Sequence, residues 1–110
     1  MAFSLQTSIL DLCVLSLLRS KDRYGYSFTQ KMKTVMPISE STIYPVLRRL
    51  KKEGLLETYD RQYQGRNRKY YRITPAGRQR LKEDEKEWER WKASLDRLLK
   101  DTGEEGEEDE

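Results

Sequence analysis

The run STIYPVLRRLKKEG at residues 41–54 is the most informative part of this 110-residue sequence. Its apolar side chains recur with the i, i+3, i+4 spacing of one helix face, and they are Ile43, Val46, Leu47 and Leu50. A serine at its start can cap the helix, and Gly54 can take the left-handed conformation that ends it. Lys51 and Lys52 lie in the last turn, where the helix dipole favours cations. The run therefore predicts a helix with one apolar and one basic face.

Two more helices are predicted on the N-terminal side of this one. Residues 4–18 carry a stripe at helical spacing that consists of Leu5, Ile9, Leu12, Cys13, Ser16 and Leu17. Because this helix is apolar over more than half its circumference, we expect it at the centre of the domain, with Cys13 as a core residue. A second helix starts near Gly25 and ends before Pro37, since the residue before a proline avoids helical angles. Its apolar face is expected to consist of Tyr24, Phe28, Met32 and Val35.

A β-hairpin is predicted after the basic helix. Residues 55–63 alternate in polarity, with Leu55, Tyr59 and Tyr63 in phase, and a turn signal separates them from a second short strand at 69–73. Cations recur along this segment with no acid between residues 61 and 72, and they are Arg61, Arg66, Arg68, Lys69 and Arg72.

The longest helix is predicted on the C-terminal side. Thr74 and Pro75 are typical of the cap and the first position of a helix, and no further breaker occurs before about Lys100. A heptad seam runs along this helix, interrupted only by Asp84, and its members are Leu81, Trp88, Trp91, Leu95 and Leu98. Since the other surfaces of the helix are densely charged, its narrow apolar stripe favours packing against a second chain.

The charge of the chain is unevenly distributed. Lys and Arg number 22 against 19 Asp and Glu, but residues 101–110 hold seven acids and no base. Residues 1–100 therefore carry a net charge of +10. Such a basic body favours a polyanionic partner, either nucleic acid or an anionic membrane surface. The acidic segment is too poor in apolar residues to fold, and we expect it to be disordered.

Composition excludes most catalytic chemistry. The chain has no His and one Cys, which rules out His-based acid–base catalysis, imidazole or thiolate-cluster metal sites and an internal disulfide. No glycine-rich phosphate loop occurs, and the carboxylates at 83–89 alternate with cations as on a solvated helix face. We therefore expect no enzyme, no metal and no cofactor. The longest apolar stretch, at 9–18, is too short to span a bilayer, so we expect a cytoplasmic protein.

The order of the predicted elements indicates a mainly α fold with a small β-hairpin. Two helices followed by a third with a basic side form a helix-turn-helix, and the hairpin beside them forms a wing. The polar side of the third helix presents residues that can reach phosphates and base edges, namely Ser41, Thr42, Tyr44, Arg48, Arg49 and Lys51. We expect a winged helix-turn-helix domain at 1–75, a dimerisation helix at 76–100 and a disordered acidic tail at 101–110.

Double-stranded DNA is the partner that this arrangement favours. A winged-helix module that binds protein or RNA is the alternative. A role at a membrane surface would need cations beside an exposed apolar helix face, whereas here the cations lie on the third helix and the wing.

Two sequence motifs at a fixed spacing resemble those of a known protein family. They are STIYPVLRRLKKEGL at 41–55 and RKYYRITPAG at 68–77, and YGY at 24–26 precedes them. Together they resemble the PadR family of bacterial winged-helix repressors, over about residues 5–99. The single short C-terminal helix is similar to that of the small, LmrR-like subfamily.

The resemblance implies a homodimer joined by the first and last helices and bound to a pseudo-palindromic operator. With the heptad seam it places dimer contacts at Leu5, Leu81, Trp88, Trp91, Leu95 and Leu98. It implies DNA contacts from Ser41, Thr42, Tyr44, Arg48 and Lys51 on the third helix and from Arg66, Arg68 and Lys69 on the wing.

The resemblance also implies an effector site. Trp88 lies 11 residues after Gly77, the spacing at which LmrR-like members place a tryptophan that stacks on planar drugs at the dimer centre. Trp91 stands beside it, where an aliphatic residue is expected. The implied effector is a small planar molecule, apolar or cationic. From spacing alone the two tryptophans could instead only pack the dimer seam, and both interpretations remain open.

Overall fold

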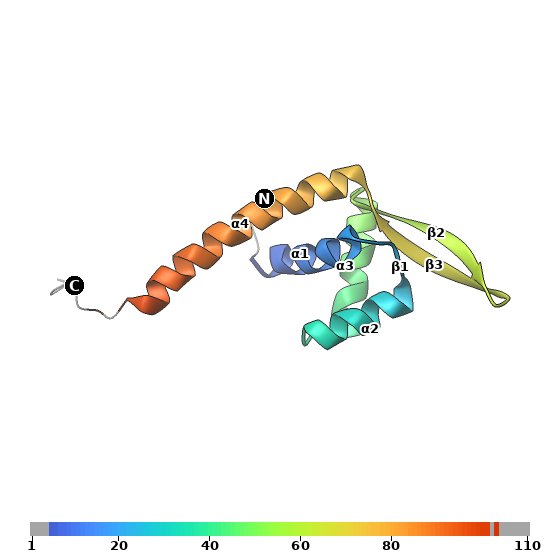
Figure 1. The fold of residues 1–110 in the computed structure, drawn as a ribbon, viewed down its shortest axis with the longest axis horizontal. Helices are drawn as coiled ribbons and strands as arrows, with labels where there is room; N and C mark the ends of the chain where they lie inside the picture. The colour runs from blue at the N-terminus through green and yellow to red at the C-terminus, as the bar shows by residue number, and fades with distance from the viewer. Residues whose placement is uncertain (1–4, 102, 104–110) are drawn as a thin grey trace.

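The computed structural model describes residues 5–101 and 103, with side chains from Thr7 onward. Its elements are α1 (Leu5–Arg19), β1 (Arg23–Tyr24), α2 (Gly25–Val35), α3 (Glu40–Lys52), β2 (Leu56–Tyr63), β3 (Arg66–Ile73) and α4 (Pro75–Lys100). The first three helices form one body, from which the β2–β3 hairpin and α4 extend in opposite directions (Figure 1). The predicted mainly α fold with a wing and a long last helix is confirmed. Among the described helices, none is long and apolar enough to cross a membrane.

Two sequence expectations concern parts of the chain outside this description. Leu5 opens α1, but its side chain lies outside the described residues. Residues 102 and 104–110 also lie outside the described residues. They make up most of the acidic segment that we expect to be disordered.

The sheet contains one strand more than the predicted hairpin. Its strand order is β1-β3-β2, and both pairings are antiparallel. The two-residue strand β1 is too short to show alternation in the sequence, which is why it was not predicted. The hairpin itself turns at Gln64 and Gly65, with φ angles of 50° and 77°. Two consecutive positive φ angles are the geometry of a tight hairpin turn, and they bring β3 forward to Arg66 instead of the expected residue 69.

The core face of α1 is not the one that the sequence stripe indicated. The fully buried residues of this helix are Asp11, Val14, Leu15 and Leu18. The predicted stripe is only half-buried in its described members, which are Ile9, Leu12, Cys13, Ser16 and Leu17. A helix that is apolar on two sides gives two candidate faces, and the structure uses the other one for its own core.

The next two helices differ in how closely they follow prediction. In α2, Phe28 and Met32 are buried as expected, but Tyr24 lies in β1 and the last residue, Val35, is 65% exposed. In α3 all four predicted apolar residues are buried, and they are Ile43, Val46, Leu47 and Leu50. The helix is followed by Gly54 with φ 80°, as its C-terminal sequence predicts.

Helix α4 begins in the core and then leaves it. Thr74 caps it by accepting a hydrogen bond from the Gly77 amide at 3.0 Å. Gly77 is required here, because an added Cβ would lie 2.2 Å from the Leu55 carbonyl oxygen. One turn later, Leu81 is 2% exposed and packs in the core of its own protomer, and its predicted place in a dimer seam stays a prediction.

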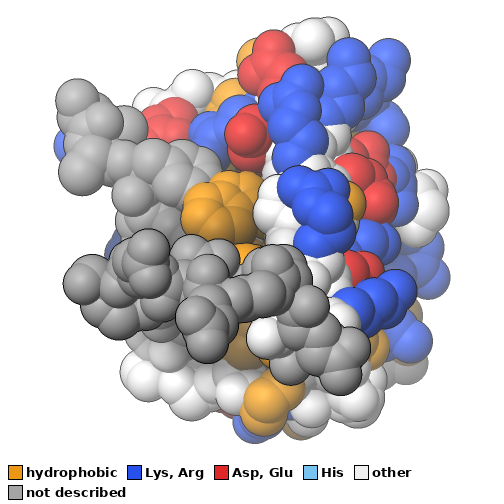
Figure 2. All heavy atoms as spheres, turned by 90° about the vertical axis from the view of Figure 1, so that its left-hand side faces the viewer, with side chains coloured by type: hydrophobic (Ala, Val, Ile, Leu, Met, Phe, Trp, Pro, Cys, Tyr) orange, Lys and Arg blue, Asp and Glu red, His pale blue; other side chains and the backbone are white. Residues whose placement is uncertain are grey.

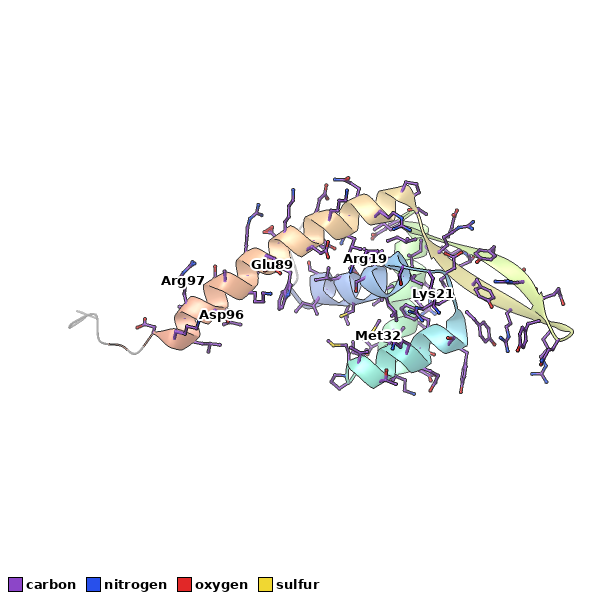
Figure 3. The ribbon with its side chains drawn as sticks, in the orientation of Figure 1. Arg19, Lys21, Met32, Glu89, Asp96 and Arg97 are labelled. Carbon is purple, nitrogen blue, oxygen red and sulfur yellow. The ribbon has the colours of Figure 1, made fainter. Side chains whose placement is uncertain are left out.

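Beyond Trp88 the helix projects from the body. Figure 3 shows Glu89, Asp96 and Arg97 along this part of α4. Leu95 is 50% exposed and Leu98 70% exposed. The projection gives the molecule extents of 70 × 27 × 24 Å.

A buried ion network joins α1, α3 and α4. Asp11 is fully buried, and its carboxylate pairs with the guanidinium of Arg49 on α3 and, at 2.7 Å, with that of Arg80 on α4. Glu53 lies 3.4 Å from Arg49 and 3.9 Å from Arg80, and Asp84 lies 3.2 Å from Arg80. Because a buried carboxylate is costly without partners, the two arginines hold three helices in one arrangement.

We expect Asp11→Asn to lower the free energy of unfolding by about 3 kcal/mol, the lower end of the range for breaking a buried ion pair. The lower end applies because Arg49 and Arg80 are about one-third exposed, so water partly hydrates their charges. Glu85→Gln is the control, since it removes the exposed ion pair with Arg19 and should cost less than about 1 kcal/mol. Urea denaturation measures both, and equal effects of the two variants would contradict the network's role.

Candidate nucleic-acid interface

The exposed side of α3 forms a continuous polar face. Ser41, Pro45, Arg48 and Lys52 recur at intervals of four, three and four residues, and all are exposed. This spacing places them in one row opposite the buried leucines. We call this row the recognition face. Thr42 and Tyr44 flank it and are half-buried.

The cations of this face are not neutralised within the protomer. Among the described residues, no carboxylate lies within ion-pairing distance of Arg48, Lys51 or Lys52. Their charges are therefore free to meet an external anion. Lys52 was absent from the predicted contacts, although its position four residues after Arg48 is a signal that the sequence already contained.

The structure places Arg49 differently from the other predicted contacts. Its guanidinium points toward α1, where it donates to Asp11, and its side chain is 35% exposed. The residue lies at the edge of the recognition face, and its charge is already matched. We therefore assign Arg49 to the ion network and do not carry it into the interface.

The wing presents its predicted cations on two faces. Arg66 and Arg68 share one face of β3, whereas Lys69 lies on the opposite face because side chains alternate along a strand. Arg61 is paired with Arg68 across the hairpin and shares its face. Side chains project from both sides of the hairpin in Figure 3. The three predicted wing residues therefore do not act as one row.

Aromatic rings hold the arginines of the first face. The Arg68 guanidinium lies 3.9 Å from the ring centroid of Tyr63 and 4.5 Å from that of Tyr24. Arg61 lies 5.5 Å from the ring of Tyr70. Cation–π contacts fix these side chains without cancelling their charge. We call this set the tyrosine–arginine ladder, and the sequence analysis did not find it because it depends on the cross-strand register.

A further arginine of the wing, Arg72, lies 4.7 Å from the ring centroid of Tyr59, but its charge is not free. Arg72 pairs with Glu57 at 2.8 Å and lies 3.8 Å from Asp22. Asp22 also accepts a 2.6 Å hydrogen bond from the hydroxyl of Tyr59, and this bond raises the pKa of Tyr59. The base of the wing is thus tied to the body through Asp22, while the cations of its outer part have no ion-pair partner among the described residues.

Tyr71 joins the wing to the recognition helix. It is buried between the hairpin and the helices, and burial raises the pKa of its hydroxyl. Tyr44 raises this pKa further and Arg48 lowers it. Because α3 also packs against β2, the recognition helix and the wing adjoin and can contact one nucleic acid together.

A second candidate site lies between α1 and α4. It is a small hollow with a cavity volume of about 30 Å³, open to solvent, lined by Ser8, Ile9, Leu12, Asp84, Glu87, Trp88 and Trp91. Trp88 is half-buried and Trp91 is 44% exposed. Figure 2 shows this end of the molecule, where apolar side chains lie exposed among charged ones. The two predicted ligand residues are thus brought together beside α1.

Comparison with known proteins agrees with this geometry. The model of the transcriptional regulator PadR-like family matches residues 14–83. A crystal structure of a Streptococcus mutans UA159 protein is 34% identical, with a TM-score of 0.78, over 99% of this chain and 100% of that one. A PadR family transcription regulator from Clostridium difficile R20291 is 30% identical, with a TM-score of 0.75, over 82% of this chain and 97% of its own.

A shorter match has a higher identity. The transcriptional regulator Rv3488 of Mycobacterium tuberculosis is 51% identical over 47 residues, which are 43% of this chain and 44% of that protein. The matched family consists of DNA-binding transcriptional regulators and not of enzymes. The free cations of α3 and the wing are consistent with that activity. This chain belongs to the PadR-like family of transcriptional regulators.

Proposed function

We propose that this chain is a homodimeric repressor that binds a pseudo-palindromic DNA operator and is released by a small planar ligand. The observation that carries the proposal is a set of cations on two adjoining elements that have no ion-pair partner in the part of the chain that the structure describes. They are Arg48, Lys51 and Lys52 on α3 and Arg61, Arg66, Arg68 and Lys69 on the wing. Ion pairs neutralise the arginines beside them, so the free charges are concentrated where a helix can enter the major groove.

The dimer is supported by apolar surface that one protomer leaves uncovered. Leu95 and Leu98 are exposed on the projecting part of α4. On the body, a groove between α1 and α2 is lined by Cys13, Leu17, Met32 and Val35, among others. In a dimer, α4 of each copy would pack its leucines into the groove between α1 and α2 of the other copy, which covers both apolar surfaces. The seam then starts at Trp88 and not at Leu81.

Two-fold symmetry would place two recognition faces on one side of the dimer. Half-sites in such dimers lie about one helical turn apart, roughly 34 Å along the duplex. The wings would then contact phosphates or the minor groove beside each half-site. This geometry requires an operator with approximate two-fold symmetry.

The effector site is supported by the hollow beside Trp88. The indole rings of Trp88 and Trp91 are large flat apolar surfaces, on which a planar ligand can stack. Ligand binding can release DNA only by as much as the ligand's affinity differs between the two conformations of the dimer. If the tryptophans only pack the seam, planar dyes will neither bind nor weaken operator binding.

For the dimer, we expect the double variant Leu95→Lys, Leu98→Lys to dissociate into folded monomers, because neither leucine belongs to the protomer's own core. Ala93→Lys is the control, since it adds a charge on the outer side of the same helix. Sedimentation velocity measures the mass, and circular dichroism checks the fold. A wild-type protein that sediments as a folded monomer at micromolar concentration would contradict the proposal.

For DNA reading, we expect Arg48→Ala to reduce affinity for an operator selected from a random duplex library by about 10- to 100-fold, equivalent to one good base contact. Lys82→Ala on α4 is the control and should change little. Fluorescence anisotropy measures both variants on selected duplex, random duplex and single-stranded RNA. Equal affinity for selected and random duplex, or a preference for RNA, would count against a repressor.

For the wing, we expect Tyr63→Leu to weaken binding to selected and random duplex alike, because Arg68 loses the ring that holds it. The slope of log affinity against log salt should fall by about 0.9 for one lost phosphate contact. Tyr63→Phe keeps the ring and should retain the wild-type slope. An equal loss in both variants would assign the effect to the hydroxyl and not to the ladder.

A further inference from the structure

The acidic segment that follows α4 is opposite in charge to the recognition helix. Residues 101–110 hold seven acids and no base. On α3, Arg48, Lys51 and Lys52 have no carboxylate of the described residues within ion-pairing distance. The two parts of the chain are therefore complementary in charge, and geometry decides where they can meet.

Within one protomer the segment starts far from the recognition helix. The end of α3 lies beside α4, because Glu53 is 3.9 Å from the guanidinium of Arg80. From Arg80 to Lys100 the helix rises about 30 Å. Figure 1 shows the far end of α4 well away from α3. Since residues 102–110 span at most about 30 Å, they would have to run fully stretched back along α4, which costs chain entropy.

The proposed dimer brings the segment much closer to the recognition helix of the other copy. Leu98 of one copy packs in the groove between α1 and α2 of the other, three residues before the first acid, Asp101. The groove extends to Met36, four residues before α3 begins at Glu40. Four residues span at most about 14 Å, and the rise from Glu40 to Arg48 is about 12 Å. Arg48 of the other copy therefore lies within about 26 Å of the groove, inside the reach of the segment.

We propose that the acidic segment of each copy lies across the recognition helix of the other copy and competes with DNA phosphates for its cations. The inference rests on the proposed dimer and names a regulation of its DNA-binding site. Because the segment is tethered, its effective concentration at the helix is on the order of 1 mM, so weak ion pairs suffice to occupy the site. The segment occupies the DNA-free protein, and it therefore lowers the affinity for selected and random duplex by the same factor.

The first test removes three charges from the segment in the full chain. The changes are Glu107→Gln, Glu108→Gln and Glu110→Gln. Duplex binding is expected to tighten at least about threefold at about 50 mM salt, and less at higher salt, where charges are screened. Fluorescence anisotropy measures the affinity for selected and random duplex.

The control for this test changes the net charge equally at another place. It removes three exposed acids on the outer side of α4, by Glu83→Gln, Glu89→Gln and Asp96→Asn. These acids do not reach the recognition helix, so the gain in affinity should be clearly smaller. An equal gain in both variants would be an effect of net charge alone and would overturn the inference. No gain in the segment variant would overturn it as well.

The second test detects the contact without DNA. A chain with Gly106→Cys and Cys13→Ala carries a nitroxide spin label at residue 106, and it is mixed with a ¹⁵N-labelled chain that carries only Cys13→Ala. Amide signals of α3 in the ¹⁵N-labelled copy are expected to broaden, and neutralising the three glutamates of the segment should abolish the broadening. Broadening confined to other elements, or present only when both labels are on one chain, would overturn the inference.

The outcomes separate this inference from the proposed function. A wild-type protein that sediments as a monomer refutes the proposed dimer, and the inference falls with it. A dimer that binds its operator but shows no broadening of α3 refutes the inference alone.

Discussion

The structure depends on one buried carboxylate, Asp11, held between two arginines from different helices. An ionised carboxylate in an apolar core costs several kcal/mol unless its partners are well placed. Arg49 from α3 and Arg80 from α4 provide that pairing. Neither helix can therefore rotate or slide against α1 without uncovering the charge. The recognition helix and the long C-terminal helix are thus set relative to each other by the same group.

This constraint gives the two ends of the molecule a physical connection. Arg80 contacts Asp84 as well as Asp11, and Asp84 lines the hollow beside Trp88. Arg49 contacts the same Asp11 from within α3, one residue after Arg48 of the recognition face. A ligand or a second subunit that acts on the Asp84 region therefore meets a continuous set of ion pairs that ends at the recognition helix. The proposed release of DNA by a ligand needs a connection of this kind.

The predictions from sequence succeeded where a local signal was unambiguous. Helix α3 has a single apolar face and a terminating glycine, and Thr74 with Pro75 is typical of a helix start. They failed where tertiary packing chose between alternatives: α1 is apolar on two sides, and the face that packs in the core is the one that includes Asp11. Leu81 fits the heptad pattern, but its side chain packs in the core of its own protomer. At the site, the residue types on α3 were predictable from the sequence. The sequence did not show that Arg49 pairs with Asp11, or that the rings of Tyr24 and Tyr63 hold Arg68, because these contacts join elements far apart in the chain.

The most direct test of the central role of Asp11 is a double-mutant cycle on its two partners. Arg49→Met and Arg80→Met, alone and combined, are compared by the free energy of unfolding in urea. Because both arginines share one carboxylate, the account predicts that their effects are not additive, with an interaction energy of about 0.5–3 kcal/mol. Effects that add to within about 0.3 kcal/mol would show that the two helices are held independently and would contradict it.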